Sequence, residues 1–173
     1  YRDRTILEML YSTALRRREL LKLDLEDIDL EGRTLTVRMG KGYKDRVVPV
    51  GTIAARFLET YLNGIRPVLL RNAPAGEPFP AVFISTRGRR LSRNALGELV
   101  VKYAQAAGIT GRVTPHTLRH TCATHMVRNG ANVRHIQEML GHANLNSTQQ
   151  YLRLTVTDLK AAHQKYHPRE KDR

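Results

Sequence analysis

The chain has 173 residues and a hydrophobic content of 41%, which excludes wholesale disorder and allows a single domain with its own core. Lys and Arg number 29 against 16 Asp and Glu, a net charge of +13, so a polyanion such as nucleic acid is the expected partner. No apolar run approaches the roughly 20 residues that cross a bilayer, and the single Cys122 excludes an internal disulfide and fits a reducing compartment, the cytoplasm.

Helical periodicity opens the chain. Ile6, Leu7, Leu10 and Ala14 follow the spacing of one helix face. Leucines among basic residues continue this pattern over residues 16–23. The first part of the chain is therefore predicted to be helical.

Alternating side chains then predict a small sheet. Residues 33–39 alternate strictly between polar and apolar types, which is typical of a half-buried strand. Residues 46–49 are predicted to be the returning strand, whose Pro49 marks an edge or an end. Residues 40–45 form the glycine-punctuated connection between them, and residues 27–30 are a candidate third strand. The prediction is an antiparallel sheet within an otherwise helical chain.

The rest of the chain carries the signals of helix ends. Ser92 and Thr114 are candidate N-caps, and Pro115 suits the first helical position. Gly108 and Gly130 stand where helices are expected to stop. The predicted fold class is mainly α with one small antiparallel β-sheet (α+β). The predicted helices after the sheet cover residues 54–62, 93–107, 115–129, 133–140, 147–153 and 156–166.

A histidine and an arginine lie three residues apart in the segment from Pro115 to Thr121. On a helix, His116 and Arg119 share one face. Attack on a phosphodiester places charge on the non-bridging oxygens of the phosphate. Guanidinium groups match those oxygens bidentately and stay charged at any working pH. Arg119 is therefore a candidate phosphate ligand.

A second arginine is expected to grip the other side of the phosphate. Arg16 stands at a helix junction, where its side chain can point into a cleft, and Glu19 is placed three residues on to orient it. The alternative is that the three consecutive arginines at residues 16–18 form only a solvated face.

Proton transfer and nucleophilic attack need further groups. Lys41 lies in a Gly-Lys-Gly turn that can approach a backbone closely, and neighbouring cations lower the pKa of a lysine, which makes it a better acid for a leaving hydroxyl. Tyr151 can supply the attacking oxygen with His116 as its base, and His142 can donate to a phosphate oxygen. The alternatives are an ordinary surface turn for Lys41 and core packing for Tyr151.

Metal binding is the other use that histidines suggest. His116 and His120 have the i, i+4 spacing of a zinc-binding pair, but no third ligand has the spacing of a known site and Cys122 is isolated. We therefore expect no metal and no cofactor. His120, His125 and His135 are expected to be structural or to face solvent.

Five segments stand out together: residues 11–20, 40–49, 114–121 and 140–142, and Tyr151. In order and spacing they resemble the tyrosine recombinase (phage integrase) family, and within it the Xer-type bacterial recombinases. The resemblance covers nearly the whole chain, and five segments in register are specific although each is weak alone. One departure is Ala14, where a glycine is common.

The resemblance implies an activity and a role for each candidate residue. The activity is DNA breakage and rejoining through a 3′-phosphotyrosyl link, without metal or cofactor, followed by strand exchange in DNA recombination or integration. The implied roles are Arg16 and Arg119 as the two catalytic arginines, Lys41 as the general acid, His116 as the general base, His142 as the second histidine and Tyr151 as the nucleophile.

The resemblance also implies an organisation and partners. Residues 1–173 correspond to a single catalytic domain, and the family's N-terminal core-binding domain has no counterpart in them. The expected partners are double-stranded DNA and recombinase protomers on paired sites, in a tetrameric synapse of the full-length protein, at a bacterial or archaeal nucleoid. Family members exchange a C-terminal segment between protomers, so Val156–Tyr166 is expected to dock either on a neighbouring subunit or within its own chain.

Two other functions stay open at this stage. A type IB topoisomerase shares the chemistry but religates the same strand, and the Xer-like spacing favours a recombinase over it. A non-catalytic DNA-binding module would keep the fold without the activity. Against that module, all six candidate positions hold chemically competent residue types.

Overall fold

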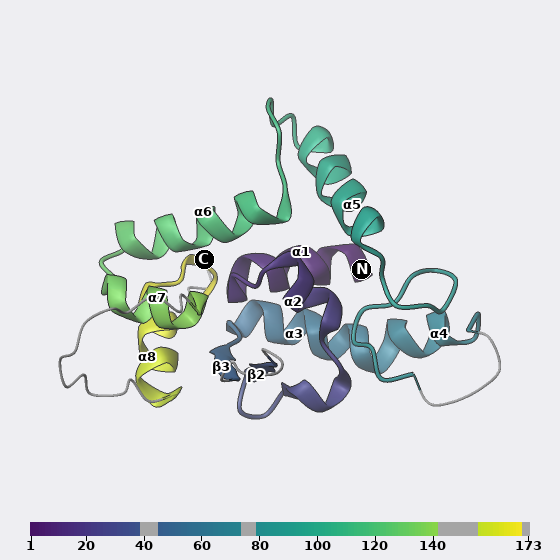
Figure 1. Cartoon of the computed structure of the whole chain (residues 1–173), viewed down its shortest axis with the longest axis horizontal. Coiled ribbons are helices and arrows are strands. Elements are labelled where there is room, and N and C mark those ends of the chain that lie inside the picture. Colours follow the sequence, from purple (N-terminus) through teal and green to yellow (C-terminus); the bar gives the residue numbers. More distant parts are fainter. Residues whose placement is uncertain (39–44, 74–78, 142–155, 171–173) are drawn as a thin grey trace.

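The computed structural model describes residues 1–38, 45–73, 79–141 and 156–170. Most of this part of the chain is helical, and one small antiparallel sheet accompanies the helices (Figure 1), which confirms the predicted class. None of the helices in these residues combines the length and hydrophobicity of a bilayer span. In chain order the α-helices are α1 Arg2–Thr13, α2 Arg17–Lys22, α3 Thr52–Thr60, α4 Arg66–Leu70, α5 Arg93–Ala106, α6 Pro115–Arg128, α7 Val133–Leu140 and α8 Val156–Tyr166.

The helices predicted after the sheet are confirmed wherever the structure describes them. The first of them is longer than predicted, because α3 continues through a π turn at Tyr61–Ile65 into α4. Short 3-10 turns lie at Leu25–Asp27 and Pro168–Glu170. The helix predicted at residues 147–153 lies outside the described residues.

The sheet has the strand order β1-β2-β3, with both pairs antiparallel. Its strands are β1 Ile28–Asp29, β2 Thr34–Val37 and β3 Arg46–Pro49. Leu35 on the central strand pairs with Val48 on β3, and both side chains are buried in the core. The three predicted strands are confirmed, although β1 and β2 are shorter than the patterns that predicted them.

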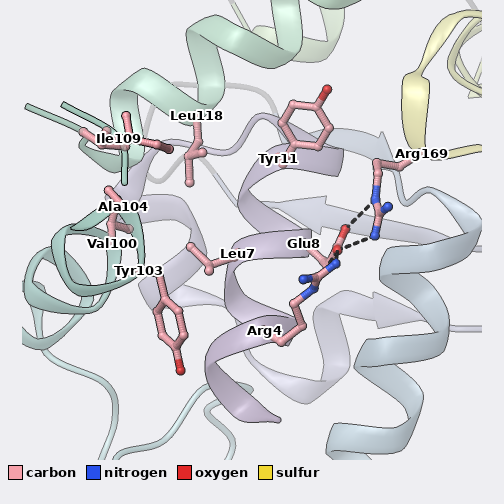
Figure 2. A pocket seen from close by; sticks show the side chains of 11 residues that line it. Arg4, Leu7, Glu8, Tyr11, Val100, Tyr103, Ala104, Ile109, Leu118 and Arg169 are labelled. Carbon is pink, nitrogen blue, oxygen red and sulfur yellow. Dashed lines mark hydrogen bonds and ion pairs between the residues drawn. The ribbon is translucent and has the colours of Figure 1, made fainter. Parts of the chain in front are cut away.

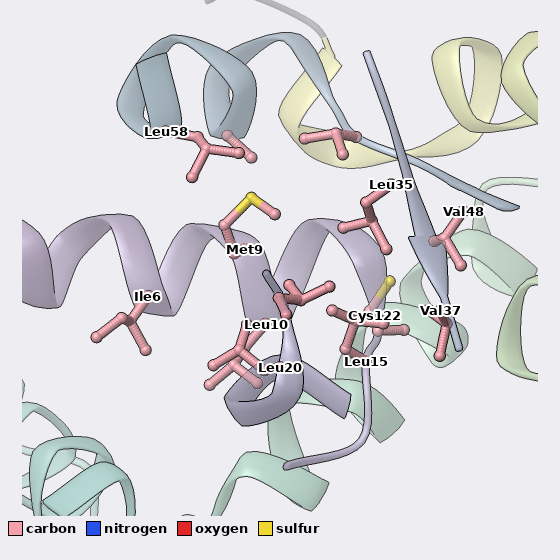
Figure 3. Close-up of a cluster of buried hydrophobic side chains, with 14 of the residues drawn as sticks. Ile6, Met9, Leu10, Leu15, Leu20, Leu35, Val37, Val48, Leu58 and Cys122 are labelled. Atoms are coloured by element: carbon pink, nitrogen blue, oxygen red, sulfur yellow. The ribbon is translucent and has the colours of Figure 1, made fainter. Parts of the chain in front are cut away.

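The helix α1 passes through the hydrophobic core. Its Ile6, Met9 and Leu10 are fully buried, and the helix packs against α3 and α6. Figure 3 shows these side chains next to apolar residues of α2, α3, α6 and the sheet. The segment just after α1 is therefore held in a fixed position relative to α6. The neighbouring core residues are Leu15, Leu20, Leu35, Val37, Val48, Leu58 and Cys122.

The first helix ends earlier than its leucine pattern predicts. Ala14 adopts a left-handed conformation with φ 50° and ψ 31°, which costs a non-glycine residue roughly 1–2 kcal/mol. Residues 16–23 therefore do not continue α1, and a second helix, α2, begins at Arg17. The break makes Arg16 the N-cap of α2, at the junction where the sequence places it.

The last described helix, α8, packs within its own chain against β3 and α7. His163 on α8 is buried, and its Nε2 lies 2.8 Å from the carbonyl oxygen of Ser12 at the end of α1. Its ring stacks on that of His167, with the ring centroids 4.3 Å apart. Within this chain α8 therefore packs intramolecularly, and its docking on a neighbouring subunit stays a prediction.

Candidate active site

The first turn of α6 presents the predicted histidine and arginine to one pocket. Thr114 caps the helix: its Oγ1 accepts a hydrogen bond from the Thr117 backbone N–H at 3.2 Å, and its own N–H donates to Thr117 Oγ1 at 3.1 Å. Pro115 occupies the first turn, where its missing N–H costs nothing. His116 is exposed and Arg119 is buried, and both line the same pocket. The predicted shared face is confirmed.

Arg119 is fixed by the C-terminal ends of two other helices. Its Nη1 donates to the carbonyl of Ala14, the C-cap of α1, and its Nη2 donates to the carbonyl of Leu140 in α7 at 2.8 Å. Helix C-termini carry partial negative charge and attract cations. Burial, together with the positive charge of Arg16, lowers the pKa of Arg119 to about 10. Arg119 therefore stays protonated at neutral pH.

Arg16 is oriented by the residue three positions further on. Its backbone N–H donates to Glu19 Oε2 at 2.7 Å, and its Nη1 donates to Glu19 Oε1 at 2.9 Å. Its Nη2 donates to the carbonyl of Gly141 at 3.3 Å. The side chain is still 43% exposed, so these contacts hold the guanidinium without covering it. The prediction that Glu19 orients Arg16 is confirmed.

A third arginine completes this cluster. Arg46, at the start of β3, forms two hydrogen bonds with Glu19. Its Nη1 donates to Oε1 at 3.0 Å and its Nη2 donates to Oε2 at 2.9 Å. Burial alone would raise the pKa of Glu19, but the hydrogen bonds from Arg46 and Arg16 outweigh it and lower the pKa. Glu19 therefore stays ionised. The sequence predicts Arg46 only as part of a strand.

The pocket between the start of α2 and the start of α6 has a volume of about 550 Å³. Among its described lining residues there is no acidic side chain, so it suits an anion such as a phosphate. Sequence reasoning missed Arg112 here and left open that Arg17 and Arg18 form only a solvated face. No local signal separates a pocket arginine from a surface one. The pocket is lined by Arg16, Arg17, Arg18, Arg112, Thr114, Pro115, His116 and Arg119.

A second pocket, of about 320 Å³, differs from the first in its chemistry. Figure 2 shows it among α1, α5 and α6, with apolar side chains such as Leu7 and Leu118 on its walls. Its main charges pair with one another, because Glu8 binds both Arg4 at 2.8 Å and Arg169 at 3.1 Å. Of these two pockets, the first is the one whose described lining combines candidate catalytic residues with basic charge and no acidic side chain.

Three predicted site residues, Lys41, His142 and Tyr151, lie outside the described residues. Two of their sequence neighbours belong to the cluster around Glu19. Arg46 follows the Lys41 turn in the chain and binds Glu19, and Gly141 directly precedes His142 and accepts from Arg16. The catalytic roles of all six candidates stay predictions.

His120 and His125 have the structural or solvent-facing positions expected of them, and His135 is half-buried. His120 is exposed, and Nδ1 of His125 lies 2.7 Å from the hydroxyl of Tyr11. Within the described ranges, no three histidine, cysteine or carboxylate side chains gather as a metal site. That no metal takes part stays a prediction.

Comparison with known proteins relates the chain to one family. The family model described as "Phage integrase family" matches residues 1–157. Tyrosine recombinase XerD of Staphylococcus saprophyticus is 41% identical over 169 residues, which cover 98% of this chain and 56% of the relative. XerD of Mycobacterium leprae is 44% identical over 170 residues, covering 98% of this chain and 54% of the relative. The chain spans about half the length of these curated relatives.

Solved structures agree with the sequence comparison. The crystal structure of XerA recombinase matches with a TM-score of 0.72 and 33% identity, over 97% of this chain and 59% of that one. The site-specific recombinase XerH, bound to its difH substrate in a pre-cleavage complex, matches with a TM-score of 0.68 and 28% identity, over 84% of this chain and 40% of that one. On the family match over residues 1–157, the chain belongs to the phage integrase family.

Proposed function

We propose that residues 1–173 form the catalytic domain of a site-specific tyrosine recombinase, which cleaves and rejoins double-stranded DNA. The observation that carries this proposal is that Arg16 and Arg119, from distant parts of the chain, line one basic pocket together with His116. The net charge of +13 supports a DNA partner. The names of the XerD relatives and the DNA-bound state of XerH support it as well.

In the proposed cleavage step, the phenolic oxygen of Tyr151 attacks a DNA phosphorus and His116 accepts the phenol proton. A bond forms between Tyr151 and the 3′-phosphate, and the 5′ oxygen leaves with a proton from Lys41. Arg16 and Arg119 bind the non-bridging oxygens, on which negative charge grows in the transition state. Their fixed positions mean that little reorganisation is needed as that charge develops.

The rejoining step reverses this chemistry on a partner strand. The 5′-hydroxyl of that strand attacks the phosphotyrosyl phosphorus and gives its proton to Lys41. The tyrosine oxygen leaves and regains its proton from His116, while His142 donates to a phosphate oxygen. One diester is exchanged for another, so the step needs no energy-rich cofactor. In the full-length protein, protomers on paired sites would form a tetrameric synapse at the nucleoid.

A DNA substrate with a nick close to the cleavage site tests the proposal. Cleavage releases a short fragment that carries the 5′-hydroxyl, and once this fragment has diffused away the covalent adduct cannot be reversed. The wild-type protein should form the adduct, and Tyr151→Phe should bind DNA equally well but form none, since only the attacking oxygen is lost. A normal adduct yield in Tyr151→Phe would move the nucleophile to Tyr43 or Tyr166. If the wild-type protein forms no adduct, the chain is better interpreted as a non-catalytic DNA-binding module.

A second duplex added to the same reaction separates the two enzyme classes. Joining of the cleaved strand to the new duplex is expected of a recombinase. Religation of the original strand alone would indicate a topoisomerase.

A further inference from the structure

Three consecutive carbonyl groups at the C-terminal end of α7, those of residues 139–141, each accept a hydrogen bond from a different arginine. The last carbonyls of a helix have no partner within it, and they carry the negative end of the helix dipole. Two of the three arginines, Arg16 and Arg119, are the candidate phosphate ligands. The third is Arg46, which does not line the phosphate pocket. The bonds are Arg46 Nε to Met139 at 3.1 Å, Arg119 Nη2 to Leu140 at 2.8 Å and Arg16 Nη2 to Gly141 at 3.3 Å.

Arg46 connects to Arg16 through Glu19. The side chains of Arg46 and Glu19 are only 12% and 10% exposed, and they meet through two parallel hydrogen bonds. The same two carboxylate oxygens accept from the backbone and from the guanidinium of Arg16. Glu19 is thus shared between a largely covered arginine, Arg46, and an exposed one, Arg16. Its position, and with it the direction of Arg16, depends on Arg46.

The backbone at Gly141 is shaped to receive Arg46. Gly141 has a φ of +65°, in the left-handed region. A Cβ at this position would lie 2.9 Å from both Cζ and Nε of Arg46, closer than real Cβ atoms approach other atoms. Both observations favour glycine at this position. Arg46 therefore packs against Gly141. The carbonyl of Gly141 accepts a hydrogen bond from Arg16, and Gly141 directly precedes His142 in the chain.

We propose that Arg46 is a positioning residue for DNA cleavage, which sets the direction of Arg16 through Glu19 and ties β3 to the end of α7. This inference rests on the proposed recombinase function. Removing one partner of a buried ion pair destabilises the fold, and a misplacement of about 1 Å at a reacting centre costs on the order of a hundredfold in rate. Losing Arg46 is therefore expected to slow the chemical step in addition to any loss of stability.

Single-turnover cleavage of nicked DNA at saturating protein tests this role. Arg46→Met, and Arg46→Lys, which keeps the charge but loses the bidentate fork, should cleave about a hundredfold more slowly. Their DNA affinity should change little, because Arg46 does not line the pocket. Arg169→Met is the matched control. Arg169 also binds a buried glutamate bidentately but does not line the phosphate pocket, so this variant should cleave normally.

A methylphosphonate substrate separates positioning from mere folding. Replacing one non-bridging oxygen by a methyl group removes the negative charge of the phosphate, which Arg16 is proposed to stabilise. The ratio of wild-type to Arg46→Met rates should therefore shrink on this substrate. In addition, Arg16→Ala combined with Arg46→Met should be no slower than Arg16→Ala alone. Gly141→Ala, which forces Arg46 to move, should behave like Arg46→Met.

The outcomes are distinct. If the wild-type protein forms no adduct, the proposed function fails. If the wild-type protein cleaves and the Arg46 variants cleave equally fast, only the role of Arg46 is overturned. If Arg46→Met and Gly141→Ala lose their thermal unfolding transition and are equally slow on both substrates, Arg46 supports the fold alone and the inference is again overturned.

Discussion

Replacing Glu170 by glutamine probes the anchor of the segment that follows Tyr151. Glu170 lies in the 3-10 turn after α8, and its side chain is 5% exposed. Its carboxylate accepts from the Thr52 backbone N–H at 3.1 Å and from Thr52 Oγ1 at 2.7 Å, at the N-terminal end of α3. Its Oε1 also lies 3.1 Å from Nδ1 of His163 on α8. The one carboxylate therefore holds the end of the chain to α3 and to α8.

The size of the effect follows from the carboxylate's pKa. Burial opposes ionisation, but the hydrogen bonds with His163 and Thr52 outweigh it and lower the pKa of Glu170 from 4.5 to about 2. At about 1.4 kcal/mol for each tenfold change, this difference stabilises the fold by at most about 3 kcal/mol, because solvent screening reduces the contribution of a partly exposed residue. Since the folded-state pKa is the lower one, the stabilisation is complete above pH 4.5 and is lost as the pH falls toward 2.

Urea unfolding of the wild-type protein and Glu170→Gln between pH 7 and pH 3 measures this directly. The variant should have a free energy of unfolding lower by up to about 3 kcal/mol at pH 7, and the difference should narrow below the ordinary carboxylate pKa. Glu59→Gln, an exposed change on α3, should stay within about 0.5 kcal/mol of wild type. A difference that is constant across the pH range, or absent at pH 7, would refute the reasoning.

Two further predictions concern DNA. If about six phosphates are neutralised, affinity measured by fluorescence anisotropy should fall roughly a thousandfold between 50 and 200 mM salt, and a flat response would argue against a DNA partner. Lys41→Ala should cleave ordinary DNA about 10²–10⁴-fold more slowly yet be nearly normal on DNA with a 5′-bridging sulfur, whose leaving group needs no proton. Arg16→Ala and Arg119→Ala should not be rescued by sulfur, and rescue of Lys44→Ala instead would move the general acid to that lysine.

The elements that the sequence predicts well are those with local causes. Thr114 and Pro115 begin α6 because a threonine oxygen and a preset φ meet the needs of a first helical turn. The three-residue spacing then brings His116 and Arg119 to one face without help from the rest of the fold. Glu19 reaches Arg16 for the same reason, since both belong to one short helix end.

The features that the sequence does not predict depend on contacts between residues far apart in the chain. Leucine spacing carries on through Ala14, so nothing local predicts the left-handed residue that ends α1. The Ala14 carbonyl is a partner of Arg119 on α6, an interaction that only the tertiary fold creates. Arg46 likewise stands in a strand pattern among valines, and its glutamate partner lies 27 residues earlier. Such a residue can be assigned only when its neighbours in space are known.

The shared support for the arginines explains how cations can gather where a phosphate is to bind. Like charges repel at close range, yet Arg16, Arg46 and Arg119 all approach the end of α7. The neutral carbonyls of that helix end attract each guanidinium without cancelling its positive charge. If each arginine were paired with a carboxylate instead, its charge would be neutralised. Glu19 binds both Arg16 and Arg46, whereas the hydrogen bonds given for Arg119 are to carbonyls, so the pocket keeps an excess of positive charge. In the proposed reaction a phosphodiester, which carries one negative charge, gains a second when the phenolate adds to it, so this excess of positive charge would favour the transition state over the ground state.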